Sequence, residues 1–145
     1  MAAMQVENKN GSRQLIMQSN QPGVEFHAKT DMPSADKISM KGYYGVISHY
    51  NDNQLQYIYL GRGQSVSWNG YSIESADPGY GIYIEINGDN LAVSSGKEFS
   101  MRFPYKITKV KNLQRNRLNL SAVGNGSVVT LPPGMDITYQ LLPAK

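Results

Sequence analysis

Seven residues within 22 consecutive positions combine side chains that could recognise a ligand. Aromatic rings offer flat apolar surfaces with polar tips, and neighbouring guanidinium, carboxylate and amide groups bind hydroxyls. Such a set could stack on the apolar face of a sugar and hydrogen-bond to its hydroxyl groups. The alternative is that the Trp and the first Tyr form a cross-strand pair that holds a hairpin. The candidate ligand-binding residues are Arg62, Trp68, Asn69, Tyr71, Asp77, Tyr80 and Tyr83.

Basic side chains gather in a second stretch: positions 97 to 117 contain seven Lys and Arg residues and one acidic residue. Between positions 42 and 96, five acids accompany a single Arg. This asymmetry predicts a positive and a negative part of the fold, and binding of acidic partners that weakens with salt. The alternative is a solvated strand face with scattered cations. The candidate basic face consists of Arg102, Lys106, Lys109, Lys111, Arg115 and Arg117.

The residue types argue against catalysis. The chain contains no Cys, and His27 and His49 are its only imidazoles, which excludes thiolate zinc sites, thiol nucleophiles and His-rich metal sites. Neither His lies in a nucleophile–base–orienter motif. Alternation places His27 toward solvent, and the position of His49 at a strand end predicts a rim residue. We therefore expect a protein that is not an enzyme and that has no cofactor and no metal.

These side chains must be positioned by strands. The chain has 145 residues, 40% hydrophobic and 17% charged, which fits one globular domain. Apolar and polar residues alternate almost everywhere, as in 82–86 and 99–103, and a period of two is typical of strands with one buried face. Asn69-Gly70 predicts a tight hairpin turn. Pro104 predicts an edge, a bulge or a crossing between sheets.

The pattern predicts an all-β fold: an antiparallel β-sandwich or jelly roll of about 8–10 short strands with little or no helix. Only one short helical turn is expected, near residues 33–37. Residues 61–64 are interpreted as a flexible hairpin loop that exposes Arg62. We expect a polar N-terminal arm over residues 1–14 and a single β-sandwich domain over residues 15–145.

The function predicted from these features is a non-enzymatic surface-recognition or assembly subunit, adhesin-like, pilin-like or lectin-like. It would bind a glycan or protein partner, or a second copy of itself, through loops and strand edges. The alternatives are a virus or phage structural protein (capsid or tail) and a small membrane-acting toxin that touches the membrane surface. Nucleic acid is not an expected partner, because charge and exposed aromatics are too sparse. No transmembrane segment and no signal peptide are read from the sequence, and an extracellular, cell-surface or virion-surface location is expected.

Overall fold

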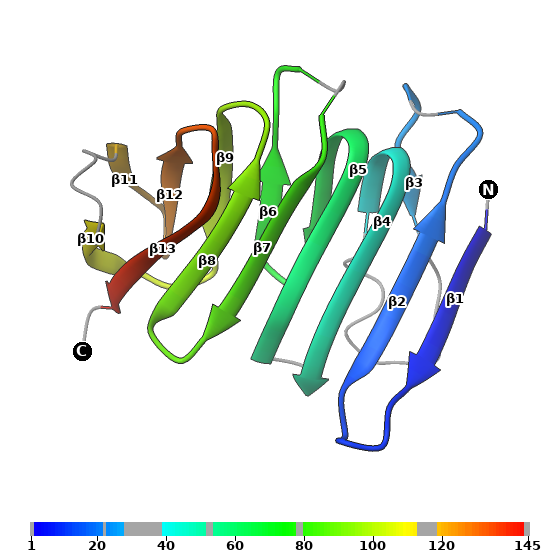
Figure 1. Ribbon diagram of the computed structural model, residues 1–145, viewed down its shortest axis with the longest axis horizontal. Coiled ribbons are helices and arrows are strands. Elements are labelled where there is room, and N and C mark those ends of the chain that lie inside the picture. The colour runs from blue at the N-terminus through cyan, green and yellow to red at the C-terminus, as the bar shows by residue number, and fades with distance from the viewer. Residues whose placement is uncertain are drawn as a thin grey trace.

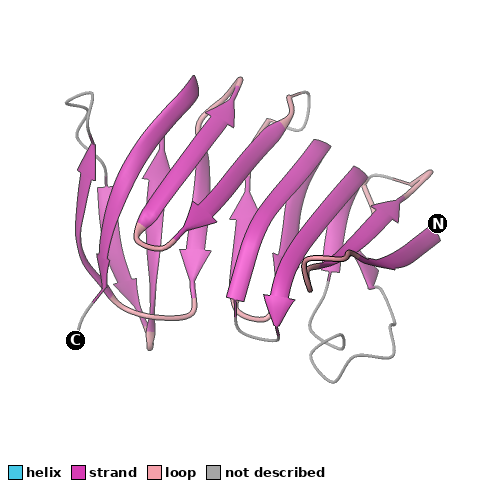
Figure 2. Ribbon diagram, turned by 60° about the horizontal axis from the view of Figure 1, so that its bottom comes forward, coloured by secondary structure: helices cyan, strands magenta, loops and turns pink. Residues whose placement is uncertain are grey.

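The computed structural model describes residues 2–21, 23–27, 39–51, 54–77, 80–112 and 119–143. This part of the chain forms thirteen strands and contains no helix (Figures 1 and 2). The predicted all-β antiparallel sandwich is confirmed, with more strands than expected; the turn expected at 33–37 lies outside the described residues. The strands are β1 (Ala2–Glu7), β2 (Arg13–Gln18), β3 (Phe26–His27), β4 (Ser39–Asn51), β5 (Gln54–Trp68), β6 (Tyr71–Glu74), β7 (Ile82–Asn87), β8 (Asn90–Ser95), β9 (Phe99–Phe103), β10 (Ile107–Asn112), β11 (Asn119–Val123), β12 (Gly126–Leu131) and β13 (Gly134–Pro143).

The strands form two layers that share the long hairpin of β4 and β5 (Figure 1). The first half of β5 pairs with β7, and the second half pairs with β6, while β4 runs beside β5 along most of its length. The front layer therefore has the order β10-β13-β8-β7-β5-β4-β2-β1. The rear layer has the order β11-β12-β9-β6-β5-β4-β3. At the far end, β10 approaches β11, so that the sandwich is nearly closed.

A cluster of glycines lets the β4–β5 hairpin bend from one layer into the other. A Cβ on Gly42 would lie 2.6 Å from the Cα of Gly63, and a Cβ on Gly63 would lie 2.4 Å from Leu60. The pairing shifts by one residue at this point, and Arg62 adopts a φ of 48°. The flexible hairpin loop predicted for residues 61–64 is therefore wrong, because these residues continue β5 as a bulged strand. Arg62 is nevertheless exposed, as predicted.

The core lies between the layers and contains the inward residues of both. Alternation is visible in β8 and β9, whose buried residues recur at every second position, and in β12 from Ser127 onward. In β4 a shift of register between Ser48 and His49 interrupts it, so that Ile47, Ser48 and His49 are all buried. The prediction that His49 lies at the rim is therefore wrong: its side chain is 1% exposed. The side chain of His27 is not among those described.

The predicted turns are confirmed where they are described. Trp68 pairs with Tyr71 across Asn69 and Gly70, whose φ angles are 47° and 91°. Both angles are positive, as the tight hairpin turn requires, which explains the Asn-Gly sequence. Pro104 follows β9 in the rear layer and precedes β10, which pairs with β13 in the front layer, so it marks a crossing between sheets.

Two further expectations concern the N-terminal segment and the absence of a membrane-spanning segment. Within the segment expected as a polar arm, β1 pairs with β2 over six residues at the edge of the front layer. No helix among the described residues is long and apolar enough to span a membrane.

Candidate functional site

The structure distributes the seven predicted ligand-binding residues over three places. Trp68 and Tyr71 lie in the core, and Asn69 occupies the turn between them. Arg62 is exposed at the bend of β5. Asp77, Tyr80 and Tyr83 lie on or beside the outer side of the front layer, where other tyrosines join them.

Trp68 is a core residue in this fold. Its side chain is 0% exposed and stacks on His49, with centroids 4.7 Å apart, and on Tyr71, with centroids 6.1 Å apart. Phe103 and Tyr105 extend this ring cluster through Tyr71. The structure therefore contains the cross-strand pair that the sequence offered as the alternative, and no surface of Trp68 is available for stacking on a ligand.

Four tyrosines from neighbouring strands form what we call the tyrosine face: Tyr44, Tyr57, Tyr59 and Tyr83. Tyr59 lies directly opposite Tyr83 in the pairing of β5 with β7, and Tyr57 shares its side of β5 with Tyr59. The rings form two pairs: Tyr44 with Tyr59 at 5.9 Å, edge to face, and Tyr57 with Tyr83 at 5.7 Å. Because the residues between them, such as Ile58 and Ile84, are fully buried, these rings occupy the outer side of the front layer.

Polar groups are fixed beside these rings. Gln14 Nε2 donates a hydrogen bond to Tyr57 Oη, and Tyr83 Oη donates to Glu85 Oε2 at 2.9 Å. Burial, together with this hydrogen bond and the negative charge of Glu85, raises the pKa of Tyr83 to about 12. Tyr83 is therefore a neutral hydroxyl at any physiological pH, and it donates its hydrogen bond to Glu85.

A small pocket of about 210 Å³ adjoins the tyrosine face. Its walls include Tyr59, Tyr83 and Met135, and Gly81 and Gly96 contribute backbone without a side chain. Met135 is 73% exposed, which is unusual for a large apolar side chain. The pocket is thus a largely apolar recess that opens beside a row of aromatic rings.

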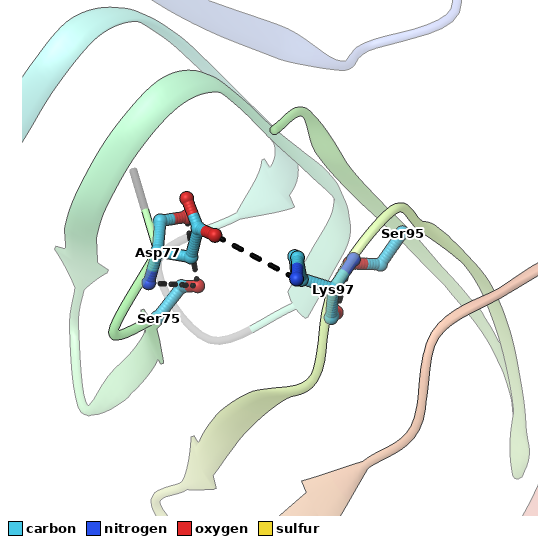
Figure 3. A network of polar contacts seen from close by, with 4 residues as sticks. All are labelled: Ser75, Asp77, Ser95 and Lys97. Carbon is cyan, nitrogen blue, oxygen red and sulfur yellow. Dashed lines mark hydrogen bonds and ion pairs between the residues drawn. The ribbon is translucent and has the colours of Figure 1, made fainter. Parts of the chain in front are cut away.

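The two loops beside this pocket are held together by a polar network (Figure 3). Lys97 Nζ lies 3.8 Å from a carboxylate oxygen of Asp77, and 5.4 Å from the centre of the Tyr80 ring. The Oγ atoms of Ser75 and Ser95 each accept the backbone N–H two residues further on, from Asp77 and Lys97. The structure thereby gives Asp77 and Tyr80 a place in the same loop-to-loop contact, near Tyr83.

The basic residues are spread over two strands and a loop. Arg102 lies in β9, Lys106 follows it in the loop, and Lys109 and Lys111 lie in β10; all four are exposed. Arg115 and Arg117 lie outside the described residues. No group of three or more potential metal ligands occurs in the part of the chain that the structure describes.

Three residues of the tyrosine face, Tyr44, Tyr57 and Tyr59, were missed by the sequence reasoning. The signal for Tyr57 and Tyr59 was the recurrence of Tyr at alternate positions in one strand, opposite a second strand with Tyr83 and Glu85; Tyr44, in β4, shares no such alternation. That signal acquires meaning only when the pairing of β5 with β7 is known, because alternation within one strand does not say which strand lies beside it.

Comparison with known proteins adds one family. The family described as "Endo-acting ulvan lyase C-terminal domain" matches residues 1–86, which is more than half of the 145 residues. The matched segment includes the β4–β5 hairpin and all four tyrosines of the tyrosine face. No curated protein matches the chain. The family is a carbohydrate-related all-β domain, and on the extent of this match the chain belongs to the endo-acting ulvan lyase C-terminal domain family.

Proposed function

We propose that this chain is a non-catalytic carbohydrate-binding domain that holds a polysaccharide against the tyrosine face. The observation that carries the proposal is the arrangement of two tyrosine pairs on one outer sheet surface, next to a small apolar pocket. The family name supports a carbohydrate ligand, and it makes ulvan the first polysaccharide to test. The proposal includes an extracellular location, because that is where a protein would encounter such a polysaccharide.

Tyrosine rings suit this task. Each ring presents a rigid apolar surface that costs little conformational entropy to fix, and its hydroxyl remains available to a polar ligand. Tyr59 is 36% exposed and Tyr44 is 39% exposed, so both rings combine a packed edge with a free surface. The four rings are tilted against one another, by 65° in one pair and 37° in the other, so they offer both ring faces and ring edges to the apolar and hydroxyl-bearing sides of a sugar chain.

The surrounding groups supply the polar half of the contact. Glu85 accepts hydrogen bonds, and the Tyr57 and Tyr83 hydroxyls are already oriented by Gln14 and Glu85. The pocket volume of about 210 Å³ lies below the range typical of drug-sized ligands. One sugar unit would enter it while the rest of the chain lies across the rings. The side chains stack and donate or accept hydrogen bonds, and no bond-breaking step is assigned to them.

The test is affinity electrophoresis and calorimetry of the wild type, Tyr59→Ala and Tyr83→Ala with ulvan. We expect each substitution to weaken binding about tenfold or more, as is typical of central aromatic contacts. Tyr59→Phe keeps the ring and should retain most of the affinity.

The matched control is Tyr43→Ala. Tyr43 is 48% exposed and adjoins Tyr44 in the sequence, but it belongs to neither ring pair of the tyrosine face. Its removal should leave the affinity within twofold of the wild type. Equal weakening by Tyr43→Ala, or unchanged binding by Tyr59→Ala and Tyr83→Ala, would refute the tyrosine face as the binding site.

A further inference from the structure

A larger groove opens at the end of the rear layer, away from the tyrosine face. Its volume is about 510 Å³, and it lies where the β5–β6 turn, the end of β9 and the β11–β12 turn meet. This volume falls within the range of small-molecule binding sites.

Main chain forms much of the groove, since Gly70, Gly124 and Gly126 line it. A Cβ on Gly70 would lie 2.7 Å from Pro104, and a Cβ on Gly126 would lie 2.4 Å from the carbonyl oxygen of Phe103. Any side chain at these two positions would therefore push the groove walls apart. The close approach of β9 to both turns requires glycine, and it holds the groove in a fixed shape.

Arg102 brings a positive charge to this groove. Arg102 pairs with Ser72, which pairs with Ser67 in turn, so the three side chains share one side of the rear layer. All three line the groove, together with Asn125. Arg102 is exposed and forms no ion pair with any acid in the described part of the chain; Glu74, two residues beyond Ser72 in β6, is also unpaired there. The guanidinium is thus free to bind a ligand.

We propose that this groove binds an oxyanion carried by a small polar molecule, with Arg102 as the residue that recognises it. A guanidinium forms paired, charge-assisted hydrogen bonds with the two oxygens of a carboxylate or sulfate group. Ser72 and Asn125 offer a hydroxyl and an amide group around that position, and the Ser67 hydroxyl is held there by a hydrogen bond of 2.7 Å with Ser39. These groups suit a hydroxyl-bearing ligand such as an acidic sugar. This site is distinct from the tyrosine face and does not depend on the function proposed for it.

The experiment is a titration of the full-length, ¹⁵N-labelled chain followed by NMR at constant ionic strength. The probes are sodium glucuronate, inorganic sulfate and, as the neutral control, glucose. We expect glucuronate to shift the amide signals of Gly70, Ser72 and Gly126, while glucose leaves them in place. The titration with sulfate shows how much of the affinity comes from the oxyanion itself. If sulfate binds as tightly as glucuronate, the oxyanion accounts for all of the affinity; if sulfate binds more weakly, the sugar ring contributes part of it.

Three variants test whether Arg102 is the cation that binds the ligand. Arg102→Gln should lower the affinity for glucuronate at least tenfold, and Arg102→Lys, which keeps the charge but loses the paired geometry, should lower it by a smaller factor. The matched control is Lys106→Gln, an exposed cation that does not line the groove, and it should change the affinity less than twofold. Unchanged binding by Arg102→Gln, shifts centred on Lys109 and Lys111, or equal shifts with glucose would overturn the proposal. Tyr59→Ala should leave this titration unaffected, so that failure of either site is recognised separately.

Discussion

His49 stacks on Trp68 inside the core, with ring centroids 4.7 Å apart and an angle of 23° between the ring planes. Trp68 is the only Trp of the chain and is 0% exposed. We therefore expect tryptophan emission at the short wavelengths of a dry environment, with little quenching by acrylamide until the protein unfolds. Saturating glycan at the tyrosine face should not move the emission maximum. A red-shifted, readily quenched emission from the folded protein would place Trp68 at the surface and contradict the structure.

Removing the Trp68 ring should greatly reduce the stability of the folded protein. Trp68→Ala leaves a cavity between His49 and Tyr71, and substitutions of this kind reduce the free energy of unfolding by about 3–5 kcal/mol. Urea unfolding followed by circular dichroism measures the loss. Tyr80→Ala is the comparison, because Tyr80 is 45% exposed and should cost far less.

Tyr139 carries a buried hydroxyl that has no hydrogen-bond partner among the described residues. Tyr139→Phe removes this group, and the free energy of unfolding should stay the same or rise by up to about 1 kcal/mol. The matched control is Tyr71→Phe, which breaks the hydrogen bond between Tyr71 and Tyr105 and should lower it by about 1 kcal/mol. A marked loss of stability in Tyr139→Phe would mean that its hydroxyl has a partner after all.

Alkaline pH should destabilise the fold in a defined window. Burial raises the pKa of Tyr83 to about 12, from an ordinary value of 10.0, and burial also raises the pKa of Tyr105. A raised pKa means that the folded state holds the proton more tightly than the unfolded state. The resulting stabilisation is complete below pH 10 and is lost as the pH rises through about 12.

Absorbance titration of the tyrosinates, with urea unfolding at each pH, checks this window. Tyr83→Phe should remove one late-titrating tyrosine and make the loss of stability between pH 10 and 12 shallower. If the pKa of Tyr83 lies near 10, the Tyr83 hydroxyl is neither buried nor hydrogen-bonded to Glu85 in solution as the structure has it.

The bend between the layers should tolerate no side chain at Gly42. A Cβ there would lie 2.6 Å from the Cα of Gly63, which is backbone and cannot rotate away. Gly42→Ala should therefore lower the free energy of unfolding by about 1–3 kcal/mol. Gly23→Ala is the control, because nothing lies within 4 Å of the position of its Cβ, and it should stay within about 0.5 kcal/mol of the wild type.

Short sequence motifs were sufficient to predict turns and strand breaks, which depend on a few neighbouring residues. Asn69-Gly70 predicted the turn that brings Trp68 opposite Tyr71, and Pro104 predicted a break that proves to be the crossing between the layers. Both depend on backbone restrictions of single residues, which act whatever the surrounding structure.

Non-local pairing could not be predicted in the same way. Tyr59 and Tyr83 are 24 positions apart, and only the order of strands in the sheet places them opposite each other. The misjudged positions have a related cause. His49 follows a shift of register that alternation does not reveal, and Gly61-Arg62-Gly63 has the composition of a loop although β4 holds it in a bulged strand.

The β4–β5 hairpin is the structural feature with the widest consequence. Its two strands adjoin in the sequence, and together they supply a template to both layers (Figure 1). Contacts close in sequence form with little loss of chain entropy, so we expect this hairpin to be ordered in the transition state for folding. Pairing of β10 with β13, which joins Asn112 to Tyr139, would follow later. The chain would then fold outward from a single hairpin that belongs to both layers, so that the two layers would grow from the same starting point.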